Sequence, residues 1–190
     1  MAFDRRGLDD RRCPSMPVGE PIALKEVQLR LGVPQHVLIH LCEKGVIEPE
    51  FAETSGRGKR REFSERNVFE FGVALALRRL EMPVATTALV IRVLGSFMLA
   101  VTKAAPGFEL PGSLLDGKVA LALYFYDGAA LVLSARGGAF RRPLLLRGKV
   151  PERASTERPN VRVEKLGVLP EQFEARLEID LTAIARKVLK

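Results

Sequence analysis

The side chains best suited to chemistry in this chain are four cations in one glycine-bearing stretch, residues 54–63 (TSGRGKRREF). They are Arg57, Lys59, Arg60 and Arg61. Cations grouped this closely on the tip of a loop can neutralise several phosphates of a nucleic-acid backbone at once. A solvated charged loop is the alternative interpretation of the same residues.

Two short amphipathic helices precede the basic stretch and would have to position it. Apolar residues at three- and four-residue steps predict helices over residues 24–31 and 35–44. Residues 32–34 (GVP) lie between them. The glycine can adopt the positive φ that ends a helix, and the proline favours the start of the next one. This spacing is typical of a helix-turn-helix.

The second helix has a polar outer face. Leu38 and Leu41 form its inward pair. The polar residues that we expect to meet the major groove of double-stranded DNA are Gln35, His36 and His40. The two histidines also have a spacing that could share a metal ion, but Cys42 projects from another side of the helix, so we expect no metal site.

A longer helix pair is expected after the basic stretch, which itself is interpreted as a β-hairpin wing. Ser64 is suited to cap the third helix. The buried stripe of that helix would be Val68, Phe71 and Leu75. Residues 82–84 (MPV) separate it from a fourth helix. Four helices and a wing predict one domain over residues 21–104.

The fourth helix contains an almost wholly apolar run, residues 88–101. A membrane span needs about 20 apolar residues, whereas this run is shorter and contains Arg92, so we expect a buried helix and no membrane partner. One side would pack on the N-terminal domain, and the other needs the C-terminal half or a second subunit to cover it. That second side consists of Val90, Val93, Phe97 and Met98.

Strand patterns dominate residues 105–190, so the predicted fold class is α+β with a small C-terminal α+β module. Strands over residues 119–126 and 129–135 flank Asp127-Gly128, a typical two-residue hairpin turn. The other predicted elements are strands through residues 144–146, 161–165 and 175–180, a polar loop over 150–159 and a closing helix over 181–189. The module contains no histidine or cysteine. We therefore expect a dimerisation or sensing module, with no catalytic residues and no cofactor.

The charge balance favours a polyanionic partner. Lys and Arg number 30 against 23 Asp and Glu, a formal net charge of +7. Cys13 and Cys42 do not make a disulfide framework, so we expect a reducing, cytoplasmic location. Residues 1–20 have mixed charge without an apolar core, which predicts a disordered arm and neither an export signal nor a membrane anchor.

The order of four segments resembles the winged helix-turn-helix DNA-binding domain of the MerR family. The segments are residues 22–27 (IALKEV), 32–33 (GV), 44–47 (KGVI) and 61–64 (REFS). The resemblance covers roughly residues 21–95 and implies a dimeric bacterial transcription regulator. By motif position, it gives Arg61 the role of the wing arginine that contacts phosphate.

The chain also departs from the family pattern. Ile39-His40 stand where the family usually has an arginine followed by a tyrosine, which removes one expected phosphate contact. Ala23 and Pro34 replace the threonine and serine that usually cap the first two helices. No cysteine follows Cys42, so metal sensing of the family's type is not expected.

Together these patterns favour a homodimeric transcription regulator that binds an inverted repeat. Its C-terminal module would serve dimerisation or respond to an unknown effector or protein partner. Two alternatives stay open. An architectural or recombination accessory protein would bind and bend DNA without controlling a promoter by itself. A protein-interaction module would keep the winged fold but use the surface around Ile39 for a protein partner.

Overall fold

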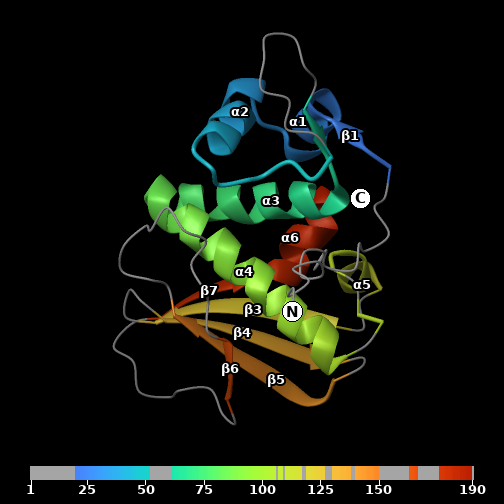
Figure 1. Ribbon diagram of the computed structural model, residues 1–190, viewed down its shortest axis with the longest axis vertical. Coiled ribbons are helices and arrows are strands. Elements are labelled where there is room, and N and C mark those ends of the chain that lie inside the picture. The colour runs from blue at the N-terminus through green and yellow to red at the C-terminus, as the bar shows by residue number, and fades with distance from the viewer. Residues whose placement is uncertain are drawn as a thin grey trace, which may run out of the picture.

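A computed structural model describes residues 20–51, 61–105, 107–108, 110–116, 119–126, 130–137, 140–149, 163–166 and 176–189. The described chain is a mixture of helix and sheet, as the α+β prediction requires. Figure 1 shows three tiers: two short helices, α1 and α2, above the long helix α3; α4 and α6 in the middle; and a five-stranded sheet below. Predictions for residues 1–19, and for the polar loop over 150–159, lie outside the described residues.

The first two helices form the predicted corner. Helix α1 (Leu24–Leu31) ends at Gly32, whose φ is 63° and whose N–H donates to the carbonyl of Gln28 at 2.9 Å. Helix α2 (Gln35–Glu43) follows Pro34 and ends one residue earlier than predicted. Neither Ala23 nor Pro34 provides a side-chain hydrogen bond to the helix that it precedes, as the departures from the family pattern indicated.

The longer helix pair also forms where it was predicted. Helix α3 (Glu65–Arg79) begins at Ser64, whose side chain accepts a hydrogen bond from the N–H of Asn67. Helix α4 (Val84–Ala104) begins after Pro83. A two-stranded sheet joins β1 (Ile22–Ala23) to β2 (Glu62–Phe63), which are antiparallel.

The length argument used for the apolar run was wrong. Helix α4 has 21 residues because it extends through threonine- and alanine-rich segments on both sides of residues 88–101. Its Val84–Lys103 segment is long and apolar enough to cross a membrane by length and composition, and half of it is buried within the protein. Core helices of soluble proteins can have the same length and composition, so this segment is compatible with a buried helix.

The C-terminal strands form one antiparallel sheet in the order β6-β5-β4-β3-β7. Strands β3 and β4 pair from Val119 opposite Gly137 to Tyr126 opposite Ala130, so both predicted strands form, although the second covers residues 130–137 where 129–135 was predicted. The predicted turn at Asp127-Gly128 lies outside the described residues. Strand β7 returns to the other edge of β3. The bounds are β3 (Val119–Tyr126), β4 (Ala130–Gly137), β5 (Phe140–Lys149), β6 (Val163–Leu166), β7 (Arg176–Asp180), α5 (Gly112–Leu115) and α6 (Leu181–Val188).

The sheet covers the side of α4 that needed a second surface. Val93 and Phe97 are fully or almost fully buried, and a Cβ on Gly148 of β5 would lie 2.8 Å and 2.9 Å from their side chains. On the other side of the helical tier, α6 packs on α3. One apolar core therefore contains residues from Ile22 to Val188, on both sides of residue 104. The division into two domains after residue 104 stays a prediction.

Two helix glycines differ in the space around them. A Cβ on Gly72 of α3 would lie 2.9 Å from Ile184 Cγ2 and 3.1 Å from Val188 Cγ1, both in the core. A Cβ on Gly95 of α4 would meet the half-exposed guanidinium of Arg66 at 3.3 Å, which can move aside.

We expect Gly72→Ala and Gly95→Ala to shift stability in opposite directions. Both gain about 0.5–1 kcal/mol of helix preference, but Gly72→Ala also overpacks the core, at a cost of about 1–3 kcal/mol. Urea unfolding measures both variants. Shifts of the same sign would contradict this account of the α3–α6 contact.

Candidate nucleic-acid interface

The outer face of α2 carries the polar residues predicted for it. Gln35, His36 and His40 are exposed, while Leu38 and Leu41 are buried against the rest of the protein. Ile39 is partly buried between these two faces. The described residues contain no group of three or more His, Cys, Asp or Glu side chains that could hold a metal ion. This face is suited to hydrogen bonding with a polar partner.

Only the last of the four predicted loop cations lies among the described residues. Arg57, Lys59 and Arg60 fall outside them. Arg61 is partly exposed and directly precedes β2, in which Glu62 pairs with Ala23 and Phe63 pairs with Ile22. The exit of the basic stretch is therefore joined to the residues that lead into α1. The sequence did not predict this pairing because strands of two residues have no periodic pattern.

The buried side chain of Asn67 forms hydrogen bonds to the chain on both sides of the basic stretch. The side chain of Asn67 is 1% exposed. Its Oδ1 accepts hydrogen bonds from the backbone N–H of Glu50 at 3.0 Å and of Ser64 at 3.4 Å. Its Nδ2 donates to the carbonyl of Glu48 at 3.0 Å and to Oε2 of Glu70 at 3.1 Å. One amide thus connects the chain before the stretch, the chain after it and helix α3.

Sequence reasoning missed Asn67, although two signals pointed to it. It lies three residues after Ser64, where a capping box usually has Glu or Gln, and here both hydrogen bonds of that motif are present. It also lies beside Val68 and Phe71 on the side of α3 that faces the core. A polar residue on a buried stripe must have hydrogen-bond partners inside the protein.

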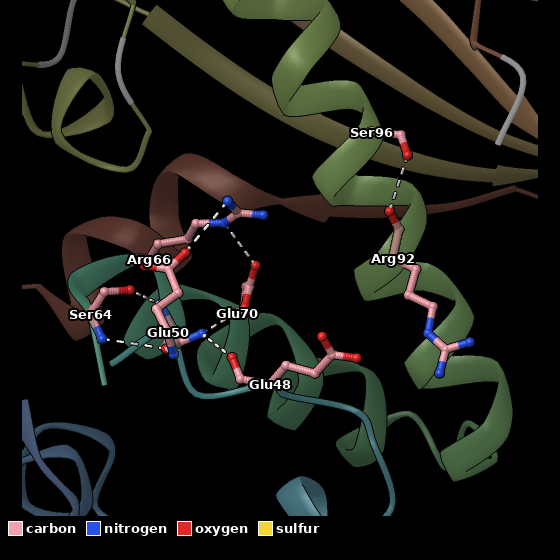
Figure 2. Close-up of polar contacts among 8 residues, drawn as sticks. Glu48, Glu50, Ser64, Arg66, Glu70, Arg92 and Ser96 are labelled. Atoms are coloured by element: carbon pink, nitrogen blue, oxygen red, sulfur yellow. Dashed lines mark hydrogen bonds and ion pairs between the residues drawn. The ribbon is translucent and has the colours of Figure 1, made fainter. Parts of the chain in front are cut away.

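Charged residues extend the network from Asn67 toward α4. Arg66 Nε donates to Glu70 Oε1 at 3.0 Å, and Arg66 Nη1 lies 3.5 Å from Glu50 Oε1 (Figure 2). Burial raises the pKa of the Glu70 carboxyl above its ordinary value of 4.5. The charge of Arg66 and the hydrogen bonds from Asn67 and Arg66 lower that pKa, and the charge of Glu50 raises it, but burial has the largest effect.

The raised pKa of Glu70 predicts a pH-dependent effect of Glu70→Gln. The folded protein binds this proton more tightly than the unfolded chain, so the wild type loses stability as pH rises from 4.5 through the folded-state pKa. Glutamine cannot ionise. We expect Glu70→Gln to gain stability relative to the wild type as pH rises from 4 to 7.

Urea unfolding at several pH values measures this difference. Glu50→Gln is the matched control, since its carboxylate contacts the same arginine but is 36% exposed and its charge remains solvated. The account of Glu70 fails if Glu70→Gln is less stabilising at pH 7 than at pH 4.

A further cation lies beside the end of α2. Arg92 projects from α4 and is exposed, and a Cβ on Gly45 would lie 4.0 Å from its Nη2. Lys44, also exposed, is the C-cap residue of α2. Cations at the C-terminal end of a helix interact favourably with its dipole. They also add positive charge next to the polar face of α2.

The arrangement combines an exposed polar helix face, cations at the end of that helix, and Arg61. The buried hydrogen bonds of Asn67 join the chain on both sides of the basic stretch to α3. Such a surface can bind a polyanion by charge and hydrogen bonding. Comparison of the chain with protein-family models, curated proteins and solved structures found no match. Functional conclusions therefore depend on the residues of this chain.

Proposed function

We propose that this chain is a DNA-binding transcription regulator with a MerR-like winged helix-turn-helix. Two features of the described residues together carry the proposal. The exposed polar face of α2 is one feature, and the described end of the basic stretch, Arg61 followed by β2, is the other. The β1–β2 pairing and the hydrogen bonds of Asn67 support a fixed relation between them.

In this proposal α2 enters the major groove and the basic stretch contacts the flanking phosphates. The residues near bases are Gln35, His36 and His40. The residues near phosphates are Arg57, Lys59, Arg60 and Arg61. Phosphate contacts set affinity and register, whereas contacts to base edges set sequence preference.

The proposed assembly is a cytoplasmic homodimer that binds an inverted repeat, because two-fold protein symmetry matches two-fold symmetry in the site. The C-terminal sheet would then serve dimerisation or respond to an effector. Its packing against α4 supports a mechanical connection to the N-terminal helices, since α4 lies against the sheet and follows α3 directly.

Selection from random double-stranded DNA tests the proposal. The full chain is incubated with the pool at two salt concentrations, and the retained fragments are sequenced. We expect an enriched inverted repeat whose half-sites are about one helical turn apart. Salt-sensitive retention without enrichment would instead favour an architectural or recombination accessory protein, and no retention would favour a protein-interaction module.

A further inference from the structure

We infer that Asn67 is a positioning residue that fixes, against α3, the backbone on both sides of the basic stretch: Glu48 and Glu50 before it and Ser64 after it. Asn67 is itself buried, so it can act on a partner only through the backbone that it holds. The hydrogen bonds that Asn67 makes to the backbone of Glu48, Glu50 and Ser64 do not depend on what the protein binds. Its effect on DNA affinity rests on the proposed function.

The hydrogen bonds of Asn67 match the full capacity of an amide. A carboxamide has two N–H donors and an oxygen with two lone pairs, and Asn67 uses all four. Aspartate would keep the acceptors but lose both donors, and it would place a second carboxylate beside Glu70. Alanine would lose all four side-chain bonds. The site therefore requires an amide of this length.

The bonds hold the described backbone on both sides of the basic stretch. Glu48 and Glu50 precede it, and Ser64 follows it three residues after Arg61. Along the chain, Asn67 is 17 residues from Glu50 and 19 from Glu48 on the entering side, but only three from Ser64 on the leaving side. The leaving side is also held by the β1–β2 pairing and the Ser64 cap. On the entering side Asn67 bonds the backbone of Glu48 and Glu50, and the ion pair between Arg66 and Glu50 is partly exposed. Loss of Asn67 should release the entering side first.

Hydrogen exchange tests the positioning role without DNA. In Asn67→Ala we expect exchange of the Glu50 amide to accelerate by about 10-fold, because its acceptor is removed. Ser64→Ala is the matched control: it removes the cap of the same helix end but leaves the asparagine amide in place. The Glu50 amide should keep its wild-type protection in that variant. Unchanged protection in Asn67→Ala would overturn the inference.

DNA binding tests the consequence. We expect Asn67→Ala to reduce affinity by about 10-fold and to make the slope of log K against log salt shallower by about 1, as if one phosphate contact were lost. In an Arg60→Glu, Arg61→Glu background the same substitution should have no further effect on affinity. An equal loss in both backgrounds would show that Asn67 acts through general stability and would overturn the positioning role.

The two proposals can fail separately. If the wild type does not bind DNA, the proposed function fails and the exchange result alone decides the role of Asn67. If Asn67→Ala does not fold, Asn67→Asp is measured in its place. There we expect faster exchange in the backbone around Glu48 with the Glu50 amide still protected, and wild-type exchange throughout this segment would overturn the inference.

Discussion

Replacing Arg60 and Arg61 together by glutamate is expected to weaken DNA binding by about 100-fold near 0.1 M salt. Each phosphate contact releases close to one counterion, which is worth about 10-fold in affinity at that salt concentration. The double substitution removes two such contacts and adds repulsion. Fluorescence anisotropy with a labelled duplex measures the change.

The matched control reverses two charges far from the proposed interface. Lys103→Glu with Arg136→Glu changes the net charge by the same amount at two exposed side chains, one in the last turn of α4 and one in β4 of the sheet, which lies at the opposite end of the protein from α1 and α2 (Figure 1). We expect a loss of less than a few-fold, since exposed charges more than about 10 Å apart are screened. If both double variants lose affinity equally, total charge and not the basic stretch governs binding.

The second large effect is on stability: Phe97→Ala should lower the free energy of unfolding by about 3–5 kcal/mol. Phe97 is fully buried between α4 and Gly148 of β5. Removing its ring leaves a cavity at the contact between the helical part and the sheet. Because the core is continuous across that contact, we expect one cooperative transition in which both parts lose stability together.

Urea unfolding followed by circular dichroism and by hydrogen exchange checks this prediction. Leu99→Ala is the control on the same helix, since Leu99 is 55% exposed, and it should cost less than about 1 kcal/mol. Two separate transitions in the wild type, with Phe97→Ala affecting only one of them, would contradict a shared core.

Local sequence patterns predicted most of the elements. The three- and four-residue spacing of apolar residues predicted α1 and α2, Ser64 and Pro83 marked the starts of α3 and α4, and Asp127-Gly128 separated β3 from β4. These features depend on neighbours in the chain, so the sequence displays them directly. The one-turn helix α5 is too short to show a period and was not predicted.

Contacts between distant segments were harder to predict. The apolar second side of α4 showed that a partner surface was needed but did not distinguish the sheet from a second subunit. The answer depends on Gly148, whose missing side chain lets Phe97 approach the sheet. Likewise, nothing local in residues 176–180 shows that β7 joins the edge of β3 opposite β4.

The candidate site was predicted in part. The outward direction of Gln35, His36 and His40 followed from the helical period and is confirmed, while their contacts to DNA stay predictions. The importance of Asn67 was missed because its partners Glu48 and Glu50 lie 17 to 19 residues away. The sequence displayed the cations of the basic stretch but not the buried amide that holds its ends.

The salt dependence of DNA binding by the full-length wild type tests the central claim most directly. With four cations of the basic stretch on phosphates, log K should fall linearly with log salt, with a slope of about −3.6 or steeper. The proposal predicts this slope on any duplex and tighter binding on the selected repeat. An absence of binding at about 50 mM salt, or an affinity independent of salt, would contradict it.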